Sequence, residues 1–250
     1  MEEKKLSVLA TSLISLAIVL ASVVLGNAYK YKFVSAETIS TTGLAEKEFT
    51  SDLVIWNSSF SSYSMDRKVA FESLKADQLK IKDYLISKGI KETEIVFSAI
   101  KVTEQIKTER KYAGIDGYSE ISTFAGYKLS QNFDIESKSL DIIEKTAREI
   151  TELLEQGINI SSSQPSYYYT KLEDLKISLI SNATENATIR AKNIAEKGNS
   201  TLGSLKNATM GVFQITGKTS SEEYSWGGVY NTSDRNKKAS ITVKLEFAIK

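Results

Sequence analysis

Residues 6–25 form the longest apolar run of the chain and contain no charged side chain. As a helix, this run extends about 30 Å, which matches the hydrocarbon core of a bilayer. We therefore expect a short polar N-terminus at residues 1–5, a transmembrane anchor or signal segment at residues 6–28, and a stalk at residues 29–35. The predicted anchor residues are Leu6, Leu9, Leu13, Leu16, Leu20 and Leu25.

Two other interpretations of this apolar run stay open. A cleaved signal peptide would end in small residues, and Gly-Asn-Ala at residues 26–28 fits such a site, although signal-peptide cores span only about 7–15 apolar residues. A helix buried in the protein core is the third interpretation. Two lysines stand before the run and two stand after it, so the positive-inside rule does not orient it.

Beyond residue 35, apolar side chains recur at helical spacing in two segments. The first places Ala70, Leu74, Ile81 and Leu85 on one face, and the second places Leu140, Ile143, Ala147, Ile150 and Leu154 on one face. The predicted helices run from Ser64 or Asp66 to Lys88, from Ser137 or Ser139 to Gln156, and from about Lys171 to Lys197. Each is followed by a glycine, which commonly ends a helix.

The remaining apolar segments favour strands, through alternation or through β-branched and aromatic residues. In the clearest of them, every second residue from Ile241 to Ile249 is apolar. Other strands are predicted at residues 39–60, 95–102, 127–135, 158–169 and 209–216, and polar loops are predicted at residues 107–121 and 219–236. Pro165 limits regular pairing within its segment. We therefore predict an α+β domain over residues 36–250, with an antiparallel or mixed sheet that carries helices on one face.

The composition excludes several classes of catalytic and metal-binding site. The 250 residues include no Cys and no His, and the net charge is +1. These absences exclude a Cys nucleophile, a Ser-His-Asp triad, thiolate or imidazole metal sites and disulfides. The near-neutral charge gives no electrostatic reason to expect a nucleic-acid partner. Two carboxylates suffice for glycosidase-type chemistry, but no spacing of acids points to such a pair. We expect neither an enzyme nor a bound cofactor or metal.

Three acids, Glu46, Glu48 and Asp52, share one face of the first strand region. Such a cluster has two functional interpretations, an acid–base pair and a cation site. Calcium takes about 6–8 oxygen ligands, and no loop pattern of Asp, Asn and Gly accompanies these acids. We therefore interpret the cluster as a solvated strand face.

Aromatic residues gather at two places in the C-terminal half. Tyr167, Tyr168 and Tyr169 precede the third predicted helix, and strand alternation separates Tyr168 from its two neighbours. A glycine-containing loop further on also carries aromatics, which are enriched in interface cores. The predicted contact surface consists of Tyr168, Tyr224, Trp226 and Tyr230. The alternative is a loop folded back onto its own domain.

Several short strings, in this order, resemble the SIMPL-domain family. They include Gly43-Leu-Ala-Glu-Lys-Glu48, Asp52-Leu-Val-Ile-Trp56, Gly126-Tyr127, Tyr169-Thr-Lys-Leu-Glu-Asp-Leu-Lys176, Ala183-Thr-Glu-Asn-Ala187, Arg190-Ala-Lys192, Ser200-Thr-Leu-Gly203 and Gly211-Val-Phe-Gln-Ile215. The resemblance covers roughly residues 36–250 and is strongest to the membrane-anchored branch, in which an apolar span directly precedes the domain.

This resemblance implies an exported bacterial protein, with links in some relatives to stress tolerance and to ring-like oligomers. It offers no catalytic residues. The expected location is the inner (cytoplasmic) membrane, with a single span and the C-terminal domain in the periplasm or outside. We expect a non-enzymatic envelope protein that acts through homo-oligomerisation or contact with an envelope protein. The alternative is a module that binds a small molecule or lipid of the envelope.

Overall fold

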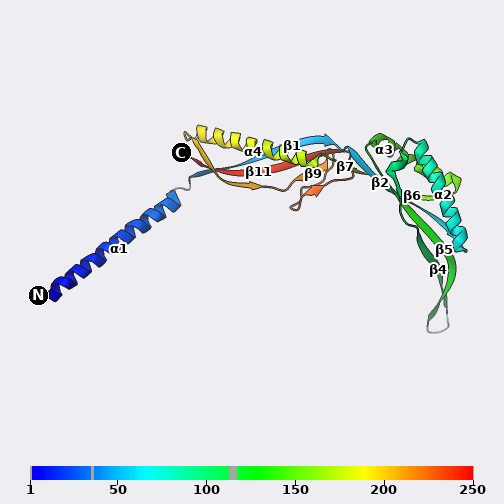
Figure 1. Ribbon diagram of the computed structural model, residues 1–250, viewed down its shortest axis with the longest axis horizontal. Helices are drawn as coiled ribbons and strands as arrows, with labels where there is room; N and C mark the ends of the chain where they lie inside the picture. The colour runs from blue at the N-terminus through cyan, green and yellow to red at the C-terminus, as the bar shows by residue number, and fades with distance from the viewer. Residues whose placement is uncertain (1, 35–36, 113–116, 250) are drawn as a thin grey trace. The chain divides into compact units, whose positions relative to one another are not determined.

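The computed structural model describes residues 2–34, 37–112 and 117–249 (Figure 1). The chain divides into two compact units. The first consists of Met1–Glu46, Lys176–Phe213 and Ser240–Lys250, and the second consists of Lys47–Leu175 and Gln214–Ala239. Helices and two separate sheets are both present, which confirms the predicted α+β class.

The N-terminal helix α1 runs from Glu2 to Val34. Within it, Ser12–Lys30 is long and apolar enough to cross a membrane, and none of these residues is buried. This exposure argues against a buried core helix and leaves a membrane span or a signal sequence. Leu13, Leu16, Leu20 and Leu25 are all exposed. Leu6 and Leu9 lie in the same helix, but their side chains fall outside the described residues.

Helix α1 is longer than the predicted anchor. It includes residues 29–34, which the sequence assigned to a stalk. No glycine or proline stands between Ala28 and Val34 to end the helix, so the helix continues past the apolar run.

In the first unit, a long helix packs on a sheet through small side chains. The sheet contains β1 (Thr38–Thr50), β11 (Asn236–Ile249) and β8 (Leu202–Met210), with β11 paired to both of the others. Helix α4 runs from Leu172 to Lys197, and its buried positions in this unit are Leu179, Ala183, Ala187, Ala191 and Ala195. Thr41 Oγ1 in β1 donates to the Ala187 carbonyl over 2.9 Å. The predicted alternation in the last strand is confirmed, because Ile241, Val243, Leu245 and Phe247 are buried.

The second unit contains a six-stranded sheet. Its strands are β2 (Leu53–Ser64), β3 (Ile95–Phe97), β4 (Lys101–Tyr112), β5 (Tyr118–Ser137), β6 (Asn159–Ser162) and β7 (Ser166–Tyr168). The order is β3–β5–β2–β6, with β4 also paired to β5 and β7 also paired to β2. The predicted segment 158–169 is broken between β6 and β7, where Pro165 lies.

Helices α2 (Arg67–Ser87) and α3 (Leu140–Glu149) cover one face of this sheet (Figure 1). The side chain of Asp66 caps α2 by accepting from Lys68 N and Val69 N. All four residues predicted for the apolar stripe of α2 are buried. The core includes Trp56 and Phe133, whose rings meet edge to face with centroids 5.7 Å apart. A short 3-10 helix, η1 (Glu92–Glu94), precedes β3.

One predicted core position in the second helix is wrong. Leu154 is 50% exposed, whereas Leu153 is fully buried. After Glu149 the chain continues as the 3-10 helix η2 (Ile150–Gln156). A 3-10 helix has three residues per turn, so the residue below Ile150 is Leu153 and not Leu154.

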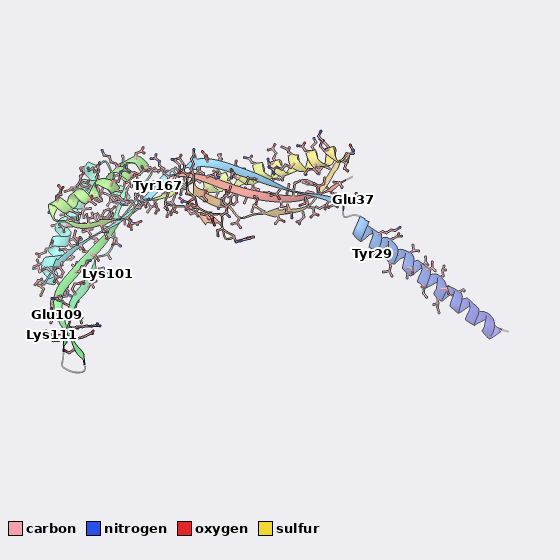
Figure 2. The ribbon with its side chains drawn as sticks, turned by 180° about the vertical axis from the view of Figure 1, so that it is seen from behind. Tyr29, Glu37, Lys101, Glu109, Lys111 and Tyr167 are labelled. Carbon is pink, nitrogen blue, oxygen red and sulfur yellow. The ribbon has the colours of Figure 1, made fainter. Side chains whose placement is uncertain are left out.

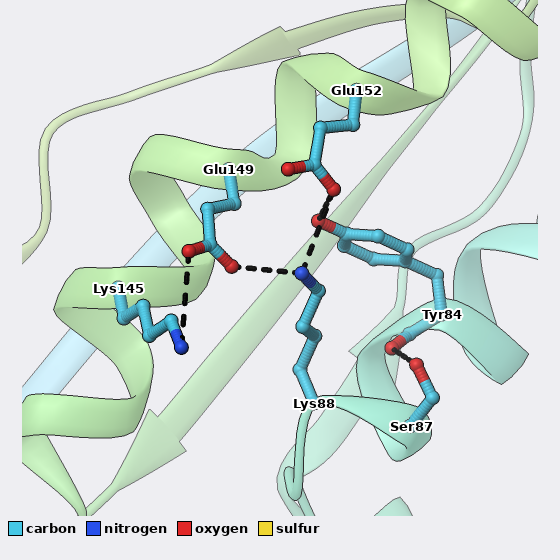
Figure 3. A network of polar contacts seen from close by, with 6 residues as sticks. All are labelled: Tyr84, Ser87, Lys88, Lys145, Glu149 and Glu152. Carbon is cyan, nitrogen blue, oxygen red and sulfur yellow. Dashed lines mark hydrogen bonds and ion pairs between the residues drawn. The ribbon is translucent and has the colours of Figure 1, made fainter.

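A polar network joins the ends of α2 and α3–η2 (Figure 3). Lys88 Nζ lies 2.7 Å from Glu149 Oε2 and 3.5 Å from Glu152 Oε2. Tyr84 Oη donates to Glu152 over 3.1 Å, and Lys88 lies 4.9 Å from the Tyr84 ring centroid. The hydrogen bond and charge of Lys88 lower the pKa of Glu149, and the same contact raises the pKa of Lys88. The network therefore fixes the two helices to each other by ion pairs.

The predicted loop at residues 107–121 is largely strand, because β4 and β5 form a long hairpin with residues 113–116 outside the described part. Figure 2 shows Lys101, Glu109 and Lys111 along one arm of it. Lys107 pairs with Glu109 over 2.7 Å, and Arg110 pairs with Glu120 over 2.8 Å. Lys107 and Arg110 are therefore paired with acids of the same hairpin.

Candidate contact surface

Trp226 stands on a tight turn in the second unit. Gly228 N–H donates to Ser225 O over 3.1 Å, which closes a β-turn with Trp226 at its second position. Gly227 N–H also donates to Ser225 Oγ over 3.3 Å. The Trp226 side chain is 100% exposed. The turn therefore presents the largest apolar side chain of its segment entirely to solvent.

A buried glutamine fixes this turn by hydrogen bonds to its backbone. Gln214 lies in strand β9 (Gln214–Gly217), which pairs in parallel with β10 (Val229–Tyr230). Its Nε2 donates to Ser225 O over 2.8 Å, and its Oε1 accepts from Ser225 N–H over 3.2 Å. The residue directly before Trp226 is thus bonded on both sides of its backbone, so the exposure of Trp226 belongs to an ordered turn.

Buried Asn231 closes the base of the same loop. Its Nδ2 donates to Glu222 Oε1 over 2.7 Å and to Asp234 Oδ2 over 2.9 Å. Its Oδ1 accepts from Asp234 N–H over 2.9 Å. Gly217 leaves room for this cluster, because a Cβ there would lie 2.2 Å from Asp234 Oδ2. The segment from 217 to 234 is therefore tied together by side-chain bonds.

Lys237 provides the third attachment. Its side chain is almost fully buried, and its ammonium donates to the carbonyl oxygens of Tyr167 and Asn231. The ammonium lies 5.5 Å from the ring centroid of Tyr230. Burial lowers the pKa of Lys237 to about 8, against the opposing effect of nearby acids. Buried lysines are uncommon unless their donors are satisfied, as they are here.

The structure brings two of the four predicted surface aromatics together. The rings of Tyr168 and Tyr230 lie with centroids 6.5 Å apart. Tyr230 is 46% exposed, Tyr224 is 57% exposed, and Tyr168 is half-buried. Tyr167 belongs to the hydrophobic core of the second unit, as the alternation allowed. We call Tyr168, Tyr224, Trp226 and Tyr230 the aromatic surface, in which the rings of Tyr168 and Tyr230 are tilted against each other.

Two of the three acids of the first strand region, Glu48 and Asp52, have separate structural partners. Asp52 accepts from Thr170 N–H and from Thr170 Oγ1, each over 2.7 Å, ahead of α4. These bonds outweigh partial burial and lower the pKa of Asp52. Glu48 pairs with Lys218 over 2.6 Å. Within the described residues, no three acidic side chains converge as a cation site.

The residues that hold the turn were not predicted. No sequence pattern indicates a role for Gln214, Asn231 or Lys237, because each bonds to a segment that lies close to it only in the folded chain. A buried amide or ammonium carries no sequence signal of its own. The exposed residues could be predicted because aromatic side chains in a polar, glycine-containing loop stand out from their neighbours.

Comparison with known proteins agrees with the resemblance seen in the sequence. The chain matches the model of the SIMPL family, described as Protein of unknown function (DUF541), over residues 39–247. No curated protein matches the chain. Because the family match covers most of the sequence and both units of the fold, the chain belongs to the SIMPL family.

Proposed function

We propose that this protein is a membrane-tethered, non-enzymatic domain that acts by binding another protein through the aromatic surface. The observation that carries the proposal is Trp226, fully exposed on a turn that Gln214 holds by two hydrogen bonds. An exposed tryptophan costs solvation free energy in an isolated protein, and tryptophan and tyrosine dominate binding energy in interfaces. An ordered turn also loses little conformational entropy on binding.

The partner in this proposal is a second copy of the chain or another envelope protein. The SIMPL match and the apolar helix Ser12–Lys30 support a protein anchored in the inner membrane with its folded units on the far side. The stress-related role expected from the resemblance remains part of this proposal. The full exposure of Trp226 favours a protein over a small ligand, because small-molecule sites are usually concave and bury most of the ligand.

The mass of the full-length protein in detergent tests the proposal. Light scattering of the wild type should give a mass greater than that of one chain. This extra mass would come from a second copy of the chain or from an envelope protein that stays bound during purification. Trp226→Ala should lose that association while the circular dichroism spectrum stays unchanged. A strictly monomeric wild type with no retained partner, or a variant that associates as the wild type does, would refute the proposal.

The orientation has its own test. The chain has no cysteine, so one introduced cysteine reports its position without background. Ser221→Cys, on the exposed loop, should react with a membrane-impermeant maleimide added outside the inner membrane, whereas Glu3→Cys should not. Reaction of the Glu3→Cys variant alone would indicate the opposite orientation.

A further inference from the structure

A groove separates helix α2 from the edge strand β3 in the second unit. Its volume is about 370 Å³, within the range of ligand sites of roughly 300–1,000 Å³. Lys75, Leu79 and Lys82 line it from α2, and Glu92, Ile95 and Phe97 line it from the η1–β3 segment. No residue pattern in the sequence indicates this groove.

The helix wall of the groove is a second face of α2. Lys75, Leu79 and Lys82 recur at the spacing i, i+4, i+7, which aligns them on one side of a helix. They lie beside the buried stripe that contains Leu74 and Ile81. Leu79 is 63% exposed, so an apolar side chain stands between two ammonium groups and faces open space.

The strand wall is an open sheet edge. Strand β3 ends the sheet order, and no strand in the described part of the chain pairs with its outer side. Ser98 N–H donates to Asn132 O over 2.9 Å, which fixes the alternation of bonds toward β5. In an antiparallel pair, residues next to a bonded residue turn their backbone groups the other way. The N–H and C=O of Phe97 and the C=O of Ile95 therefore point outward.

The charge of the groove favours an acidic ligand. Lys75 Nζ bonds to the neutral amide oxygen of Gln78 over 2.9 Å and lies 5.9 Å from the Phe71 ring centroid. Lys82 pairs with Glu92 over 2.5 Å. The groove thus carries two ammonium groups and one carboxylate, and Lys75 has neutral contacts among the described residues.

The spacing of these groups matches an extended chain. Along α2, Lys75 lies about 6 Å from Leu79, since a helix rises 1.5 Å per residue. Side chains on one face of a strand recur about every 6.8 Å. A peptide beside β3 would therefore set an apolar side chain against Leu79 and an acidic side chain, two positions away, against Lys75.

We propose that the groove between α2 and β3 binds an extended acidic peptide segment by strand addition to the outer edge of β3. The backbone of the peptide pairs with Phe97 and Ile95, an apolar side chain fills the space at Leu79, and an acidic side chain pairs with Lys75. Strand addition supplies affinity through main-chain bonds and specificity through alternate side chains. The site is separate from the aromatic surface and does not depend on the function proposed for it.

The test uses the full-length protein in nanodiscs and a fluorescein-labelled heptapeptide. This peptide has a central valine, a glutamate two positions away on each side, and serine elsewhere. It should bind saturably by fluorescence polarisation, and the Phe97 amide should become protected from hydrogen exchange. A matched peptide with lysine in place of both glutamates should bind at least about fivefold more weakly.

Variants separate the groove from general charge. Lys75→Glu should weaken the glutamate peptide at least about fivefold and improve the lysine peptide, whereas Lys80→Glu, the same charge change on another side of α2, should alter neither. Leu79→Ser should also weaken binding. No saturable binding, or equal effects of Lys75→Glu and Lys80→Glu, would overturn the proposal. Binding of decanoate without protection of Phe97 would assign the groove to an amphiphilic anion and also overturn it.

Discussion

Lys237 donates a buried hydrogen bond to the carbonyl oxygen of Tyr167 over 2.6 Å. The same ammonium donates to the carbonyl of Asn231. One side chain in β11 thereby joins β7, which carries Tyr168, to the segment that follows Tyr230. Lys237 therefore links the backbone segments that carry Tyr168 and Tyr230 of the aromatic surface.

This amine makes stability depend on pH. Below about pH 8 the Lys237 amine is protonated in the folded and the unfolded chain, and above its ordinary pKa of 10.5 it is neutral in both. Between these values only the unfolded chain keeps the proton, so the free energy of unfolding rises with pH, by up to about 3 kcal/mol. Urea denaturation from pH 7 to 10.5 should show this increase.

Lys237→Met should remove that increase and lower stability at pH 10.5, because it leaves two carbonyls without their donor. Lys80→Met, on an exposed position of α2, is the control and should keep the wild-type pH dependence. A Lys237→Met profile parallel to the wild type would show that the buried amine does not titrate in this range.

The two tryptophans should report two extreme environments. Trp56 is fully buried, and its Nε1 donates to Ser162 Oγ over 3.1 Å, whereas Trp226 is fully exposed. Acrylamide should therefore quench one fraction of the fluorescence strongly and the other weakly. Trp226→Phe should remove the strongly quenched, red-shifted fraction alone. Uniform quenching of the wild type would contradict the exposure of Trp226.

Gly43 should be intolerant of any side chain. A Cβ at this position would lie 2.0 Å from the carbonyl oxygen of Ala183, so α4 would have to move away from β1. Gly43→Ala should lower the free energy of unfolding by about 1–3 kcal/mol, measured by thermal or urea denaturation. Gly227→Ala is the matched control, because a Cβ there meets nothing within 4 Å. Similar losses in both variants would contradict the close packing of α4.

The ion pair of Lys88 and Glu149 should stabilise the fold at pH values between the titration of Glu149 and that of Lys88. Glu149 has a lowered pKa, so its contribution is present above its ordinary value of 4.5 and is lost as pH falls through the lowered value. Lys88 has a raised pKa, so its contribution is present below 10.5 and is lost only at higher pH. Lys88→Met should reduce Tm by roughly 1–3 °C at pH 7 and less in high salt.

The effect of Lys88→Met should also shrink as pH falls below 4.5, because the stabilisation by Glu149 is lost as the pH passes through its lowered pKa. Lys145→Met is the control, because Lys145 lies 3.9 Å from Glu149 at an exposed position. An equal Tm change at pH 3 and pH 7 would indicate a packing effect of the Lys88 stem.

Local patterns predicted those parts of the fold that depend on one segment at a time. The stripe from Ala70 to Leu85 has helical spacing, and the run from Ile241 to Phe247 alternates, so both could be predicted from the sequence. Leu154 was misplaced because the change from α to 3-10 winding after Glu149 has no sequence signal.

The attachment of the aromatic surface could not be predicted in the same way. Trp226 stood out as an aromatic residue in a polar loop, but Gln214 and Lys237 reach it only once the strands are paired. The α2–β3 groove was also missed, because it depends on where β3 ends in the sheet order and not on any residue pattern.

Contact through Trp226 is tested most directly by a photo-crosslinking amino acid placed at that position in the full-length protein in its membrane. We expect a light-dependent product of defined mass, identified by mass spectrometry as a second copy of the chain or one envelope protein. The same amino acid at Lys80 should not give that product. No product at position 226, or identical products at both positions, would contradict the claim that this turn is a contact site.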